Sequence, residues 1–519
     1  EYIKDRYITA EEVLELLEEV LPESNLLSGA VIAFDGYTGF TPNQKAVLYR
    51  LFLKADCILS SVTIDEGEDF FQLGGEEELF SMPKEMIDDL VSLARKSGNE
   101  IMDPIILPAK SGHRYIQGGK LSFLEQNLFR NRKVNFHGES EDQIQIMSCM
   151  NPRAELHRAA ASIRKLVQEG QLRYRDIALV TPALDEYKEY AASIFREYGI
   201  PLYLDVRTTP SDHPLMELIR GLFEVQIRDY SYQSIMKLLR SGIPILPMED
   251  VDFLDNYLIA SGARGYQAYS NPFPYKPRGF SEEDLLRIEQ IRSELMENLT
   301  PFTEAVLHAN GDVRALATAL YYFLDRIECE QYIHERADEL DDLNLEQTAF
   351  VYRNVFSKVM RILDKMVELL DGDDIGPKEF LEILDAGVDT LKIGTIPESN
   401  DTVVMGDLER TRLNDIKALF VLGVCDAWIP KSESKGGILS DFERELLYEN
   451  AFELSATSRK RAFRQKYYLY SVLTKPSQLL HISFCRQYSD GKSAHPAFLV
   501  DEIKSLFPDL CVLTEEIPD

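Results

Sequence analysis

Cysteine is scarce in this sequence of 519 residues, and its six cysteines are scattered singly along the chain. There is no Cys-x-x-Cys step and no cysteine–histidine cluster at zinc spacing, which excludes the common structural zinc sites. A disulfide-stapled secreted scaffold is excluded by the same scatter. We therefore expect six separate, mostly buried thiols in a reducing compartment.

Long apolar runs and phosphate loops are missing as well. No segment approaches the ~20 apolar residues that span a bilayer, and no basic-then-apolar leader opens the sequence. We therefore expect a cytoplasmic protein with no membrane contact. The pattern GxxxxGK[ST] occurs nowhere, so no backbone cradle with its lysine is available for the β- and γ-phosphates of a nucleotide.

Positive charge is in short supply. Lysine and arginine total 56 against 87 aspartates and glutamates, which gives a net charge of −31. Because non-specific DNA binding depends on cations that neutralise phosphates, a chain this acidic is a poor free-standing DNA binder. Any nucleic-acid role needs a local basic groove, or a partner chain that carries the positive field.

What the sequence does contain is an alternation of strand and helix patterns. Apolar strand-like runs recur through the chain, and amphipathic helical patterns separate several of them. The expected strands are 31–34, 57–64, 144–149, 175–182, 202–205, 402–408, 417–424 and 478–484, with helices at 1–28, 44–55, 151–170 and 185–198. This order predicts an α/β protein with parallel sheets.

A long helical block separates the earlier strands from the later ones. From 244 to 396 the pattern is helical, with expected helices at 281–295, 313–327 and 350–370. The segment 264–280 is rich in proline and glycine, so we expect an irregular surface loop there. The return of strands after this block predicts one sheet domain interrupted by a helical insertion.

The tip of the first expected strand carries the most informative motif. The apolar run 31–34 ends in Asp35, the position at which a nucleotide-hydrolysing domain presents its Mg²⁺-binding carboxylate. A working motor places glutamate next, to orient the attacking water, but this chain has Gly36. Asp35 either keeps a weak Mg²⁺ or structural role or caps the turn by accepting from the N–H groups of Tyr37 or Thr38, and the cap is the interpretation we favour.

Several later segments resemble UvrD-type superfamily 1 helicases. These segments are 143–205, 401–436 and 462–484, and the order of parts, including the helical block, is that of the group. Within the group the chain is most similar to the AddB (RexB) family of helicase-nuclease subunits. The likeness rests on the stretches at 35–42 (DGYTGFTP), 174–178 (YRDIA), 199–201 (GIP), 212–215 (DHPL), 439–444 (LSDFER) and 473–477 (LTKPS).

The resemblance implies a degenerate helicase architecture with RecA-like sheets. Residues 1–28 correspond to the helical end of a 1B-like insertion and 29–142 to the C-terminal part of a first, 1A-like RecA domain. Residues 143–243 and 397–519 correspond to a second, 2A-like RecA domain, and 244–396 to a 2B-like helical insertion.

The resemblance also marks positions at which motor chemistry is lost. Pro182 and Lys475 stand where an active motor supplies phosphate-contacting arginines, and lysine lacks the planar fork of arginine. The loop from Gly406 to Arg412 lacks the usual coupling pattern. A family nuclease domain would lie beyond Asp519, and the E-x-K step at 433–435 sits in a Ser/Gly-rich loop where we expect no nuclease.

Cations that could contact DNA form three groups. The densest consists of Arg459, Lys460, Arg461, Arg464 and Lys466; the second of Arg130, Arg132 and Lys133, beside Phe129 and Phe136; the third of Arg410 and Arg412. Either of the first two could bind phosphates, with aromatic rings available for base stacking. The alternative is a solvated face that balances a very acidic surface.

The resemblance implies a helicase-like subunit of an ATP-dependent helicase/exodeoxyribonuclease in double-strand-break repair. It would scan the 3′-ended single strand while an AddA-like motor/nuclease partner translocates along DNA from a double-stranded end. The family implies Mg²⁺, ATP and an iron–sulfur cluster for the whole protein; we expect no cofactor, no ATPase and no nuclease activity in this chain. The alternative function is a protein-interaction scaffold without direct DNA contact.

Overall fold

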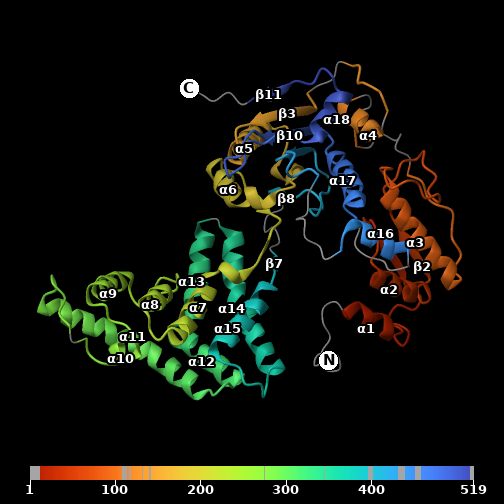
Figure 1. Cartoon of the computed structure of the whole chain (residues 1–519). Coiled ribbons are helices and arrows are strands. Elements are labelled where there is room, and N and C mark those ends of the chain that lie inside the picture. The colour runs from red at the N-terminus through yellow and green to blue at the C-terminus, as the bar shows by residue number, and fades with distance from the viewer. Residues whose placement is uncertain are drawn as a thin grey trace. The chain divides into compact units, whose positions relative to one another are not determined.

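A computed structural model describes residues 12–107, 114–115, 119–130, 132–138, 142–273, 275–343, 345–394, 401–430, 439–449 and 457–514. The chain divides into two compact units (Figure 1). One unit combines residues 1–204 with 399–519 and holds the sheets, and the other, 205–398, is almost entirely helical. None of the helices in the described ranges combines the length and the apolar character that crossing a bilayer requires.

A seven-stranded parallel sheet forms the centre of the first unit. Its order is β11-β3-β10-β9-β4-β8-β5, and every pairing in it is parallel. The strands are β3 (Ile144–Cys149), β4 (Ile177–Thr181), β5 (Leu202–Leu204), β8 (Val403–Asp407), β9 (Ala418–Val421), β10 (Leu479–Cys485) and β11 (Val512–Thr514). Because β4 lies between β9 and β8, segments from both sides of the helical block build one sheet. The predicted α/β class and the interrupted sheet are confirmed.

The sheet forms because its strands are buried along nearly their whole length. Every residue of β4 and β9 is buried, which matches the continuous apolar runs expected of a parallel sheet covered on both faces. Helices α5 (Pro152–Gln168), α6 (Leu184–Glu197), α17 (Ser458–Leu473) and α18 (Phe498–Leu506) accompany it. Helix α5 begins where Asn151 accepts from the Ala154 amide at 2.9 Å, with Pro152 in the first turn.

The N-terminal part of this unit has a small sheet of its own. Strands β1 (Val31–Phe34) and β2 (Cys57–Ser60) pair in parallel, joined through α2 (Pro42–Phe52). Thr41 and Gln44 form a capping box at the start of α2. Helices α1 (Val13–Val20), α3 (Ser81–Ser97) and α4 (Lys120–Asn127) complete this part, and α16 (Asp441–Glu449) precedes α17. The second expected strand, 57–64, ends early, at Ser60.

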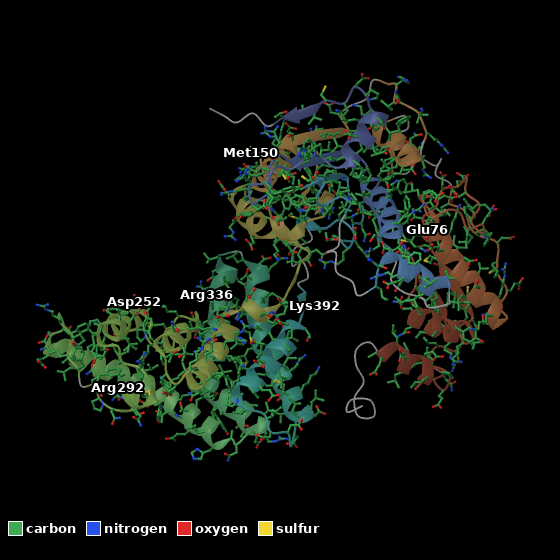
Figure 2. All side chains as sticks on the ribbon, viewed as in Figure 1. Glu76, Met150, Asp252, Arg292, Arg336 and Lys392 are labelled. Carbon is green, nitrogen blue, oxygen red and sulfur yellow. The ribbon has the colours of Figure 1, made fainter. Side chains whose placement is uncertain are left out.

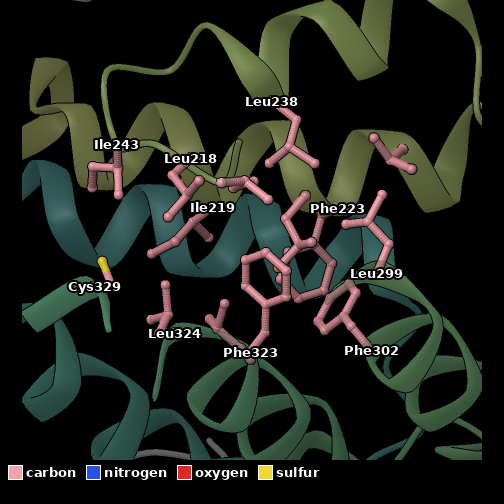
Figure 3. Packing of buried hydrophobic residues seen from close by; sticks show 14 of the residues in the cluster. Leu218, Ile219, Phe223, Leu238, Ile243, Leu299, Phe302, Phe323, Leu324 and Cys329 are labelled. Atoms are coloured by element: carbon pink, nitrogen blue, oxygen red, sulfur yellow. The ribbon is translucent and has the colours of Figure 1, made fainter. Parts of the chain in front are cut away.

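The helical unit has a single large core. Its elements are β6 (Arg207–Thr208), α7 (Pro214–Ile227), α8 (Tyr232–Leu239), α9 (Met248–Ser261), α10 (Tyr266–Ser270), α11 (Glu282–His308), α12 (Val313–Arg326), α13 (Cys329–Asp342), α14 (Glu346–Leu369), α15 (Pro377–Asp389) and β7 (Ile393–Gly394). Figure 3 shows Phe223 of α7, Phe302 of α11 and Phe323 of α12 turned toward one another. The unit starts at Asp205 rather than 244, because α7 and α8 pack into this core. The assignment of ranges to named helicase domains stays a prediction.

The segment 264–280 differs from the irregular surface loop that its composition predicted. It contains the short helix α10, and Tyr269 within it is fully buried. The Tyr269 carbonyl accepts from the Nη1 of Arg292, labelled in Figure 2 on α11, at 2.5 Å. Aromatic residues outweighed proline and glycine here, because the rings of Tyr257, Tyr269 and Phe273 pack against one another.

Candidate nucleic-acid interface

The tip of β1 presents a carboxylate without a second acidic neighbour. The Ser61 hydroxyl, just beyond β2, donates to Asp35 Oδ1 and in turn accepts from the Gly36 amide at 3.4 Å. Among the described hydrogen bonds none joins Asp35 to the amides of Tyr37 or Thr38, so the favoured turn cap is replaced by this serine contact. Gly36 has φ +69°, and a Cβ added there would meet no atom within 4 Å.

Lys475 lies close enough to this strand tip to interact with its charge. Burial and the neighbouring Arg114 lower the pKa of Lys475, while Asp35 opposes both effects. The Thr474 carbonyl accepts from Arg114 Nη1 at 3.3 Å and from the Tyr115 hydroxyl. The structure therefore brings together two of the four predicted motor positions, Asp35 and Lys475, at one end of a tethered turn.

The residues at this tip do not fit a magnesium–nucleotide complex. The site offers one carboxylate, which already accepts from Ser61, and one lysine with a lowered pKa. Within the described ranges, which include all six cysteines, no three histidine, cysteine or acidic side chains are grouped to hold a metal ion. That this chain carries no cofactor stays a prediction, and the E-x-K step at 433–435 lies outside the described residues.

The remaining motor positions lie at the carboxyl ends of β4 and β8. Pro182 directly follows β4, where the Thr181 hydroxyl accepts from the Ala183 amide at 3.2 Å. Asp407 ends β8, and its Oδ1 accepts from the amides of Glu409 and Arg410 at 3.0 and 3.1 Å. This turn places Arg410 and Arg412, both exposed, at the same sheet edge as Pro182.

The basic run at 459–466 is divided between two sides of α17. Lys460 Nζ lies 2.7 Å from one carboxylate oxygen of Glu85 on α3, and Arg464 Nη2 lies 3.1 Å from the other. These two cations, one helical turn apart, are therefore neutralised within the protein. Because Glu85 is far away in the sequence, the run alone could not show this division.

The other cations of the run flank an aromatic ring. The Arg459 guanidinium lies 5.8 Å from the centre of the Phe463 ring, and Lys466 Nζ lies 5.4 Å from it. Arg459 is exposed, and Phe463 and Lys466 are half-buried. Neither Arg459 nor Lys466 forms an ion pair with an acid of the described residues. We call Arg459, Phe463 and Lys466 the α17 stripe. Arg461, also half-buried, donates to the Ser458 hydroxyl at 3.3 Å.

The second basic group is only partly at the surface. The Arg130 side chain is 8% exposed, pairs with Asp65 at 2.9 Å and lies over the rings of Phe80 and Tyr470. Its neighbours in sequence, Phe129 and Phe136, pack against the core of the sheet unit. This placement favours a structural role for Arg130, while Arg132 and Lys133 are exposed.

A buried carboxyl group below the sheet edge was not predicted from the sequence. Glu155 in the first turn of α5 is 1% exposed. Its Oε1 accepts from the Ser483 hydroxyl at 2.5 Å and the Gly423 amide at 3.0 Å, and its Oε2 from the Tyr187 hydroxyl at 2.5 Å. Burial raises the pKa of Glu155, against the effect of these three donors. The group ties α5, α6, β10 and the end of β9 together.

Comparison with known proteins gives consistent matches. The family model described as "ADDB, N-terminal" matches residues 1–125. The chain is 35% identical over 516 residues to the B subunit of the ATP-dependent helicase/deoxyribonuclease from Lachnoclostridium phytofermentans, and the match covers 98% of this chain and 45% of that relative. It is 30% identical to the protein of that name from Clostridium novyi, over 100% of this chain and 45% of the relative. The Symbiobacterium thermophilum relative is 31% identical, over 98% and 45%. The chain thus spans about 45% of the length of these relatives.

Proposed function

This chain belongs to the family of ATP-dependent helicase/deoxyribonuclease B subunits, and from that premise we propose that it holds single-stranded DNA without driving translocation. In the longer protein an AddA-like partner subunit supplies the motor. The pair acts on double-strand breaks for recombination, and this chain contacts the 3′-ended strand as it is drawn past.

The observation that carries the lack of a motor is the tip of β1. A hydrolysing site needs a side chain that orients the attacking water beside the metal-binding carboxylate. Here that position is Gly36, with no side chain, and Asp35 is engaged by the Ser61 hydroxyl. Lys475 lies nearby, but with a lowered pKa it is a weaker cation than the arginine it replaces.

The ATPase test uses the complex of the full-length B subunit with its partner. With the partner's own ATP site inactivated by mutation, DNA-stimulated ATP hydrolysis is expected to fall to background. Gly36→Glu in the B subunit is expected to leave that background unchanged, since no phosphate cradle accompanies the restored carboxylate. Hydrolysis that persists without the partner's site, and that falls on Asp35→Asn, would refute the proposal.

The DNA contact is supported best by the α17 stripe, because it combines two cations with a ring on which a base can stack. Replacing Arg459 and Lys466 with glutamine is expected to weaken single-strand binding by the complex and to flatten its salt dependence by roughly 0.7 per lost phosphate contact. Fluorescence anisotropy of a labelled oligonucleotide at several salt concentrations measures both. Lys460→Gln is the matched control, because Glu85 already neutralises that lysine.

A protein-interaction scaffold is the second candidate function. The net charge of −31 favours it, as does the pairing of Lys460, Arg464 and Arg130 with acids of the same chain. The same titration separates the two candidates. Unchanged affinity and salt slope in the Arg459/Lys466 double variant, with Arg410, Arg412, Arg132 and Lys133 replaced as well, would favour the scaffold.

A further inference from the structure

Helix α1 has apolar side chains on the side that no part of the described structure covers. Val13, Leu16, Leu17 and Val20 are 51%, 40%, 42% and 50% exposed. Their spacing of three and four residues makes them one continuous stripe along the helix. We call these four residues the α1 stripe. An exposed stripe of this kind marks a surface that is normally covered.

The opposite side of α1 already has a neighbour. Glu15 accepts from Asn43 Nδ2 at 3.1 Å, and Glu18 accepts from Arg50 Nε at 2.6 Å, both donors lying on α2. Leu21, directly after the helix, is 6% exposed. Because these contacts fix which side of α1 meets α2, the helix cannot rotate to bury its apolar stripe without breaking them.

We propose that, in the longer B subunit, the α1 stripe is covered by a helix from outside these 519 residues. The proposal rests on the proposed function, since it takes the chain to be part of such a subunit. The chain spans about 45% of its relatives, so sufficient sequence lies outside it. Four apolar residues over two turns match one side of a packed helix pair.

A second copy of this chain is a poorer occupant. Each copy carries a net charge of −31, and the exposed Glu19 and Glu23 lie on or next to α1. Two such surfaces would bring like charges together across a dimer interface, which opposes association. A covering helix with basic residues at its edges would instead be attracted by these glutamates.

The test compares amide hydrogen exchange in α1 between the full-length B subunit and the 519-residue chain. Exchange in residues 13–20 is expected to be roughly tenfold slower or more in the full-length protein. Leu17→Glu is expected to remove that protection in the full-length protein and to change little in the 519-residue chain. Glu19→Gln, on the same helix, is the matched control and should preserve the protection.

Three results would overturn the proposal. Equal exchange in the two proteins would show that nothing in the full-length protein covers the stripe. Protection that appears only on adding the partner subunit would assign the surface to that partner. A concentration-dependent dimer of the 519-residue chain that Leu17→Glu dissociates would assign it to a second copy. Oligonucleotide anisotropy of the same samples reports the proposed DNA contact separately, so either hypothesis can fail alone.

Discussion

At the scale of single residues, the buried carboxyl of Glu155 is the clearest structural requirement of the sheet unit. Its oxygens accept from the Gly423 amide and from the hydroxyls of Ser483 and Tyr187, all within the core. A glutamate in the first turn of a helix looks like any acid favoured by the helix dipole. Its sequence position therefore gave no sign of this role.

Replacing Glu155 with leucine is expected to destabilise the protein by about 3 kcal/mol or more, because three buried donors lose their acceptor at once. Glu155→Gln keeps one acceptor oxygen and a similar volume, so a smaller loss is expected. Urea unfolding midpoints measure both changes. Glu189→Leu on the exposed side of α6 is the matched control, with an expected change within about 0.5 kcal/mol. Equal effects at 155 and 189 would contradict the assigned role.

Two buried histidines make the folded state sensitive to acid. Burial lowers the pKa of His213 to about 4, and burial together with nearby Arg158 lowers that of His481 to about 4, both from 6.5. Between those values the unfolded chain binds more protons than the folded one, so stability falls as the pH drops from 6.5 toward 4. The full effect is on the order of 3 kcal/mol for each histidine.

The pH effect is best isolated as a difference between variants. Glu155, whose pKa is raised, changes stability in the opposite direction over part of this window, but it contributes equally to the parent and to a histidine variant. His481→Phe, beside Phe420, is expected to remove one histidine's share of the acid sensitivity. Denaturant titrations at pH 7 and pH 4.5 measure it. Parallel pH profiles of parent and variant would contradict the assignment.

At the scale of elements, the sequence predicted what depends on local pattern and missed what depends on distant partners. Strands β4 and β9 were predicted because a strand buried on both faces is a continuous apolar run. Helix α17 was predicted from its spacing, but the division of its cations was not, because Glu85 belongs to α3. For the same reason the contact of Asp35 with Ser61 was missed, since it joins the ends of two different strands.

Close packing of two helices explains one glycine that pattern alone left unassigned. A Cβ added at Gly221 of α7 would lie 2.8 Å from the Leu238 Cα of α8. Gly221→Ala is therefore expected to destabilise the helical unit by about 2 kcal/mol, since a backbone atom cannot move aside as a side chain can. The higher helix propensity of alanine offsets only ~1 kcal/mol of the steric cost.

Gly387→Ala in α15 is the matched control for this substitution. There the added Cβ would meet a methyl group of Ile362, also at 2.8 Å, but side-chain rotation can relieve that contact. Both substitutions gain the same helix propensity, so the difference in their unfolding midpoints isolates the backbone clash. A Gly221→Ala protein as stable as Gly387→Ala would show that α7 and α8 separate easily.

At the scale of the whole molecule, the order of elements was more predictable than the boundary between units. Segments before and after the helical block share one sheet, as the return of strand patterns suggested. The block was placed from 244, yet the helical unit begins at Asp205. Helices α7 and α8 carry apolar residues that suit either unit, and only the packed core shows to which unit they belong.

The composition of the two cores predicts how pieces of the chain behave in isolation. The core of the helical unit draws only on residues between Leu215 and Val388. A protein comprising residues 205–394 is therefore expected to fold alone, with high helicity by circular dichroism and one cooperative urea transition. Residues 12–204 are the matched comparison: in the whole chain β4 lies between β8 and β9, and β3 lies between β10 and β11. That piece lacks all four neighbours and is expected to unfold without cooperativity. A non-cooperative transition for 205–394 would mean that its core needs the sheet unit, and cooperative folding of 12–204 would mean that the interrupted sheet forms without its later strands.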